Sequence, residues 1–171
     1  MQTNALPAYD DTDNLTGCCP RFKPHCWDNQ HLHFEDKRFL RAVTHSAMHI
    51  PIDMGRVFSR VNTHIEDQDA YDPDDFIVLS RDTSAWNSEH LFSVSKPVAG
   101  EEMTTLSGDF ITRVFEGAYR KARVWQSEMQ KAVEKTGKTP GQVWFFYTTC
   151  PRCAKTYGKN YVIGVAEVED A

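Results

Sequence analysis

The sequence predicts an α+β fold built from a duplicated β-α-β-β unit. Two amphipathic helical patterns each lie between apolar or alternating stretches that are typical of strands. Three pairs of similar segments in the two halves are separated by nearly the same shift, about 70 residues. The expected architecture is a pseudo-two-fold, mostly antiparallel sheet with two helices on one face. Chance alternation in an α+β chain is the competing interpretation, and the shared shift favours duplication.

The first half begins with an irregular arm. Residues 1–30 are rich in proline and in acidic or amide side chains and show no steady period. A helix from Asp53 to about Asp69 follows from apolar positions at helical spacing. A loop is expected over Arg81–Ser88. Alternating or short apolar runs predict strands at residues 32–34, 39–43, 76–79 and 91–95.

The second half repeats this order. A helix is predicted from about Arg120 to Lys135, with Gly137 just beyond its end. Cys150–Asn160 is expected to be a loop. Strands are predicted at residues 105–115, 143–147 and 161–166. We therefore expect one domain over residues 31–171, made of half-repeats at about 31–100 and 101–171, with the arm over residues 1–30.

Composition and charge limit the classes of partner. The 171 residues carry a formal charge of −5, which disfavours direct binding to nucleic acid. No apolar run is long enough for a membrane span, and the first residues lack the features of a signal peptide. Five cysteines are an odd number, which argues against a secreted disulfide framework. A cytoplasmic location is the expectation.

The second half carries a family resemblance. Leu106–Tyr119 is similar to the strand of the GyrI-like family that ends in a Gly-x-Tyr turn, here Gly117-Ala-Tyr119. The helix, the Gly137 turn and an aromatic strand ending at Tyr147 follow in the family order. The resemblance implies a small-molecule-binding fold with an aromatic cleft between its repeats. Members bind flat hydrophobic compounds, some hydrolyse strained rings, and others bind a protein partner.

The resemblance and the aromatic residues together suggest a ligand site. We expect a small hydrophobic or planar molecule to bind at Tyr119, Trp125, Tyr147 and Trp86, with Trp86 as a lid. Packing in the core is the alternative for each of these rings. The family's catalytic acid usually follows the aromatic strand, where this chain has Thr148–Cys153 instead. Glu116, beside the Gly-x-Tyr turn, is therefore the candidate acid/base if the bound ligand is hydrolysed.

The cysteines form the sharpest pattern. Gly17-Cys-Cys-Pro20 and Cys150-Pro-Arg-Cys153-Ala-Lys155 resemble a bacterial subgroup that is often labelled "hydrolase". A Cys-x-x-Cys turn supplies two soft thiolates at a spacing that suits tetrahedral zinc. Cys18 and Cys19 would complete a structural zinc site that ties the arm to the last hairpin, which leaves Cys26 unused.

Two other interpretations of the cysteines stay open. One is inert thiols in a reducing compartment. The other is dithiol redox chemistry, which needs a thiolate at a helix N-terminus and a βαβ fold after it. Only 18 residues follow Cys153, too few to complete that fold. The alternative function is accordingly a metal- or redox-responsive interaction module that uses the two cysteine pairs.

Overall fold

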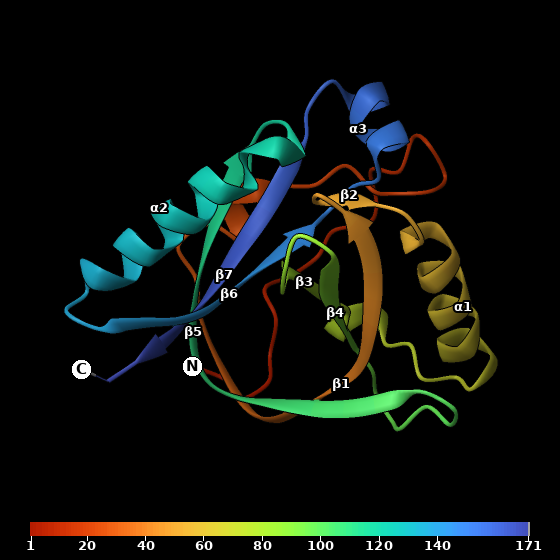
Figure 1. Ribbon diagram of the computed structural model, residues 1–171, viewed down its shortest axis with the longest axis horizontal. Coiled ribbons are helices and arrows are strands. Elements are labelled where there is room, and N and C mark those ends of the chain that lie inside the picture. The colour runs from red at the N-terminus through yellow and green to blue at the C-terminus, as the bar shows by residue number, and fades with distance from the viewer. Residues whose placement is uncertain (171) are drawn as a thin grey trace. The chain divides into compact units, whose positions relative to one another are not determined.

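A computed structural model describes residues 1–170 and contains three α-helices and seven β-strands. It divides into two compact units. Figure 1 labels the helices and strands along the chain. The terminal unit comprises residues 1–33 and the residues from Gly108 onward, and the central unit comprises Phe34–Ser107. The predicted α+β class with antiparallel strands is confirmed. Over residues 1–170, no helix combines the length and apolar character that a bilayer span requires.

The central unit contains most of one long strand and the elements that follow it. These elements are β1 (His31–Ala47), β2 (Ile50–Pro51), α1 (Met54–Asp67), β3 (Val78–Asp82) and β4 (Asn87–Ser93). Strand β4 pairs antiparallel with both β1 and β3, and β2 folds back on the end of β1. The predicted helix over 53–69 is confirmed because α1 buries Val57, Val61 and Ile65 at the expected spacing. These side chains pack on Leu40 and Phe92.

The terminal unit contains β5 (Glu102–Glu116), of which the part from Gly108 onward belongs here, α2 (Ala122–Glu134), β6 (Thr139–Tyr147), α3 (Pro151–Tyr157) and β7 (Tyr161–Glu169). Strand β7 pairs antiparallel with β5 and β6, and the core lies between these strands and α2. Gly164 on β7 permits a close approach of α2. A Cβ atom at Gly164 would lie 2.7 Å from Sδ of Met129. A larger residue at this position would therefore push α2 away from the sheet.

The two units share an element order and a pairing pattern. In each, a long strand is followed by a helix and two further strands. In each, the first strand pairs with the last, and the last pairs with the middle one: β1–β4–β3 and β5–β7–β6.

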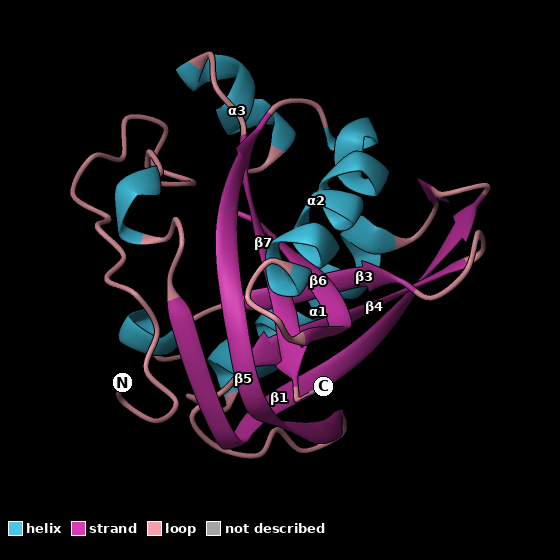
Figure 2. Ribbon diagram, turned by 90° about the vertical axis from the view of Figure 1, so that its left-hand side faces the viewer, coloured by secondary structure: helices cyan, strands magenta, loops and turns pink. Residues whose placement is uncertain are grey.

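The expectation of a loop over Cys150–Asn160 is wrong, because α3 occupies most of it (Figure 2). Pro151 stands at the first position of α3, where its missing N–H costs nothing. Gly158 ends the helix with a φ of 72°, in the left-handed region. The loop expected over Arg81–Ser88 is also shorter than predicted, since β3 extends to Asp82 and β4 begins at Asn87.

The arm of residues 1–30 has no α-helix or strand and is held by specific contacts to the terminal unit. The backbone N–H of Thr112 donates to the carbonyl of Gln30 at 2.9 Å, and the Thr112 hydroxyl donates to the carbonyl of Trp27. Trp27 is 1% exposed and packs against Phe146, with ring centroids 5.9 Å apart. These contacts fix the last part of the arm on β5 and β6.

The central unit contains a buried histidine between two hydroxyl groups. His90 on β4 is 1% exposed, and its ring nitrogens lie 2.7 Å from Oγ of Ser80 and 2.8 Å from Oγ1 of Thr44. The edge of the Phe58 ring also contacts it. Burial lowers the pKa of His90 to about 4, so the imidazole is neutral at neutral pH.

Acid should therefore weaken this fold through His90. In the unfolded chain the imidazole has an ordinary pKa near 6.5 and takes up a proton first. Stability is full above that pH and should fall by roughly 3 kcal/mol as the pH drops to about 4. Urea unfolding at pH 7, 6, 5 and 4.5 measures this change. His90→Gln, which has no titrating ring, should show a flatter pH profile, and a profile as steep as that of the parent would contradict the assignment.

Candidate metal centre

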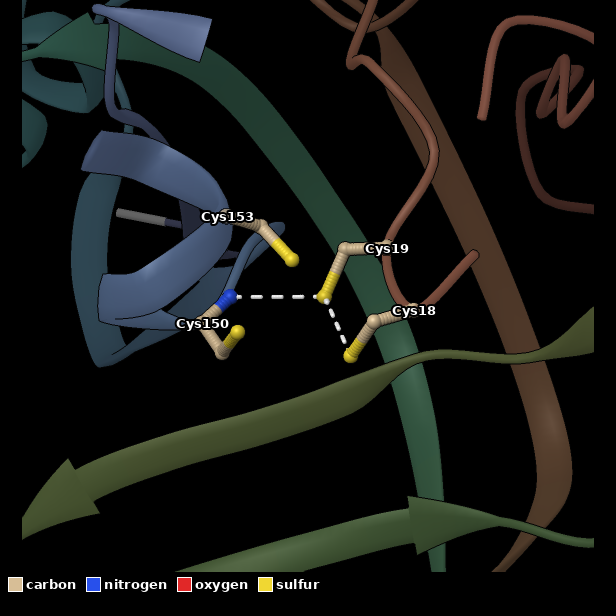
Figure 3. A group of neighbouring side chains, drawn as sticks. All are labelled: Cys18, Cys19, Cys150 and Cys153. Carbon is tan, nitrogen blue, oxygen red and sulfur yellow. Dashed lines mark hydrogen bonds between the residues drawn. The ribbon is translucent and has the colours of Figure 1, made fainter. Parts of the chain in front are cut away.

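Two cysteine pairs, distant in sequence, meet in the terminal unit. Cys18 and Cys19 come from the arm, and Cys150 and Cys153 come from the start of α3. The four sulfur atoms all lie within 4.8 Å of one another. Figure 3 shows the thiols of the two pairs directed toward one another. Cys18 is exposed, Cys19 and Cys150 are half-buried, and Cys153 is fully buried. The cluster thus lies at the surface with one side enclosed.

Local backbone structure explains why the α3 pair shares one side. Cys150 is the N-cap of α3 and has an extended backbone, with φ −68° and ψ 160°. Cys153 follows three residues later in the first helical turn. Residues three apart at a helix start lie on the same face. The helix therefore directs both thiols toward the arm, whereas an irregular loop would not fix their directions.

A threonine and a tyrosine shape the arm around its cysteines. The backbone N–H groups of Cys18 and Cys19 both lie 3.3 Å from Oγ1 of Thr16. The same hydroxyl lies 3.3 Å from Sγ of Cys153. From α3, the Tyr157 hydroxyl donates to the carbonyl of Cys19 at 2.6 Å. Thr16 holds the arm against α3 through the thiol of Cys153, and Tyr157 does so through a backbone carbonyl of the arm.

The thiols differ in their readiness to ionise. The hydrogen bond from Thr16 lowers the pKa of Cys153 to about 6. Burial raises the pKa of Cys19 to about 12. Four negative sulfur atoms at this separation repel one another, so the full set of thiolates needs a cation among them.

The spacing suits a tetrahedral ion. Zinc–sulfur bonds of about 2.3 Å in a tetrahedron place the sulfur atoms about 3.8 Å apart. Sγ of Cys18 lies 3.7 Å from Sγ of Cys19. The backbone N–H of Cys150 also points to Sγ of Cys19, 3.5 Å away (Figure 3). An ion at the centre would require the sulfur atoms to contract by at most about 1 Å from their 4.8 Å limit.

Two of the residues predicted to bind a ligand lie beside this cluster. The rings of Tyr119 and Tyr147 contact each other edge to face, with centroids 5.1 Å apart. The Tyr119 hydroxyl donates to the carbonyl of Thr149 at 2.8 Å, next to Cys150 in the chain. Burial raises the pKa of Tyr119, and negative charge at Cys150 and Cys19 adds to that effect. Tyr147 is 37% exposed, so part of this pair faces solvent.

The other predicted residues lie in different environments. Trp125 is 4% exposed and stacks on Phe115 in the core, with ring planes 14° apart. Trp86 lies between β3 and β4 in the central unit and is 57% exposed. Glu116, at the end of β5, is half exposed and lies 3.8 Å from Nζ of Lys159. Ligand binding by the aromatic residues and catalysis by Glu116 stay predictions.

A family model described as "Bacterial hydrolase" matches residues 9–168. The chain belongs to this family. The bacterial hydrolase match spans both cysteine pairs and nearly all elements of the two units. No curated protein matches the sequence.

Removing the Tyr157 hydroxyl should loosen the arm without changing a cysteine. Tyr157→Phe loses the hydrogen bond to Cys19, which is worth about 1 kcal/mol. In reduced protein kept free of metal, amide hydrogen exchange over residues 14–22 should become several-fold faster. Tyr71→Phe, an exposed tyrosine of the central unit, should leave that exchange unchanged. Equal exchange in Tyr157→Phe and the parent would show that this bond does not hold the arm.

Proposed function

We propose that this member of the bacterial hydrolase family binds one zinc ion through Cys18, Cys19, Cys150 and Cys153. The observation that carries the proposal is the gathering of all four sulfur atoms within 4.8 Å from two distant segments. An all-thiolate set is soft and favours zinc among the common divalent metal ions. Four protein ligands leave no position for water, so the zinc has a structural role.

The physical role of the ion is to fasten the arm. The first twenty residues contribute few buried apolar side chains, and they are fixed near the cysteines by the bonds of Thr16 and Tyr157. Zinc would join the two segments through two bonds to the arm cysteines and two bonds to the cysteines at the start of α3. Binding free energy at such a site stabilises the folded chain directly, because the unfolded chain has no preformed site.

For the ligand, we propose a small hydrophobic or planar molecule that contacts the Tyr119–Tyr147 pair. The half-exposed, edge-to-face rings support this proposal because they offer an apolar surface with a polar end. The shared pairing pattern of the two units supports a duplicated, GyrI-like origin. The hydrolase description of the family supports hydrolysis as the reaction, with Glu116 as the proposed acid/base. The expected ligand contacts of Trp86 and Trp125 stay predictions: Trp86 is an exposed residue of the central unit, and Trp125 is packed in the core of the terminal unit.

The zinc proposal predicts a stoichiometric metal that depends on specific cysteines. Protein expressed with added zinc should contain about one zinc per chain, and Cys19→Ser or Cys150→Ser should lower this below about 0.3. Cys26→Ser is the matched control and should keep the full content, because Cys26 lies outside the cluster. Chelation should lower the melting temperature of the parent by about 5–10 °C. Elemental analysis and thermal unfolding measure the two effects.

Three results would count against the proposed zinc site or against its role in the fold. The parent protein, grown with ample zinc, would contain almost none. Alternatively, Cys26→Ser would lose as much metal as Cys150→Ser. Finally, chelation would leave the melting temperature of the parent unchanged while removing the metal, which would show an ion bound without any role in the fold.

A redox-responsive module is the second candidate, and one observation favours it. Cys150 and Cys153 stand at the start of α3, as a dithiol site requires. With hydrogen peroxide, two thiols would lose two protons and two electrons and form one disulfide, while the peroxide becomes two molecules of water. Zinc-free protein should then lose two thiols reversibly at low peroxide, and Cys150→Ser should abolish this. A thiol count that is unchanged by peroxide contradicts the redox candidate.

A further inference from the structure

We propose that the terminal unit carries a second site, separate from the cysteines, for a small aromatic carboxylate. A cavity of about 100 Å³ opens between the arm and the segment from Thr149 to β7. Its walls contain no cysteine and no acidic residue. The lining residues are Arg21, Phe22, Thr149, Tyr157, Lys159 and Tyr161.

The charges at the cavity favour an anion. Arg21 and Lys159 are the charged residues of the lining. Each has an acidic partner outside it: Nε of Arg21 lies 3.0 Å from Asp13, and Nζ of Lys159 lies 3.8 Å from Glu116. The second distance exceeds that of a hydrogen bond, so Lys159 retains donors for a ligand. A carboxylate is therefore better suited to this cavity than a neutral group or a cation.

A buried hydroxyl without a partner supplies an independent argument. Thr149 is 6% exposed and lines the cavity, and its Oγ1 has no hydrogen-bond partner within the described chain. Leaving such a group unpaired costs about 1–3 kcal/mol. Most buried hydroxyl groups in proteins are paired, which marks the Thr149 hydroxyl as a donor for a ligand oxygen.

The remaining walls and the volume indicate the body of the ligand. Phe22 and Tyr161 pack with ring centroids 5.8 Å apart, and the Arg21 guanidinium lies 4.8 Å above the ring of Tyr157. Aromatic walls favour a flat apolar ligand. A cavity of about 100 Å³ has room for one six-membered ring rather than for a larger compound. A ring that bears one carboxylate, with benzoate as the simplest example, satisfies the shape, the charge and the unpaired hydroxyl together.

Titration of the full-length, zinc-supplemented protein with benzoate, followed by NMR of the backbone amides, tests this site. Benzoate should shift the amide signals of Thr149 and Tyr161 in a saturable way. The isosteric neutral amide, benzamide, should bind about 5-fold more weakly because it lacks the charge. Lys159→Met should weaken benzoate about 3-fold or more and leave benzamide unaffected. Lys155→Met, on α3 but outside the lining, is the matched control and should bind benzoate as the parent does.

A second variant separates a binding role from a folding role. Thr149→Val keeps the shape and removes the unpaired hydroxyl, so the free protein should keep its melting temperature or gain slightly. Its affinity for benzoate should fall about 5-fold. Zinc content is measured in each variant, which separates a failure of the carboxylate site from a loss of the metal centre. Absence of saturable shifts up to about 20 mM benzoate, equal affinity for benzoate and benzamide, or equal effects of the two lysine variants would overturn the proposal.

Discussion

The closure of the arm on α3 is the interaction on which the candidate sites of the terminal unit depend. Cys19 and Cys150 are 131 positions apart in the chain, yet the N–H of Cys150 points at Sγ of Cys19. Joining segments this far apart is entropically costly and needs several favourable contacts. Two hydroxyl groups, those of Thr16 and Tyr157, supply part of that stabilisation. A zinc ion held by four thiolates would supply the larger part.

The same closure forms one wall of the proposed carboxylate cavity. The carboxylate cavity takes Arg21 and Phe22 from the arm just after the cysteine pair, and its other walls come from residues 149–161. If the arm moved away, this cavity would lose one side. A structural metal at the cysteines would thus give shape to the proposed neighbouring ligand site without taking part in chemistry there.

The helices α1 and α2 follow from the sequence because their buried side chains recur at helical spacing on a polar background. The gathering of the four cysteines was also predictable, since two close pairs of soft ligands suit one metal ion, although redox and inert roles fitted the same pattern. The short helix α3 was missed although Pro151 and Gly158 are ordinary start and stop signals. With seven residues it is too short to show a period, so those two signals had no pattern to support them.

Side-chain contacts between distant segments could not be predicted from the sequence. Nothing in the pattern pairs Thr16 with Cys153 or Tyr157 with Cys19, because a hydroxyl forms hydrogen bonds of similar strength in many contexts. The aromatic residues show the same limit. The sequence alone offers Trp125 and Tyr147 equally as aromatic ligand contacts. In the structure Trp125 is packed in the core and Tyr147 is partly exposed. Only the folded structure distinguishes an aromatic side chain that packs in the core from one that faces solvent.

X-ray absorption at the zinc edge of the purified protein tests the central claim most directly. Four sulfur neighbours at about 2.3 Å, with no nitrogen or oxygen in the first shell, are the predicted result. This result would identify the full set of Cys18, Cys19, Cys150 and Cys153 as ligands when combined with the intact content of Cys26→Ser. A first shell containing nitrogen or oxygen atoms in place of sulfur would contradict the account, since the metal would then be bound elsewhere or by fewer thiolates.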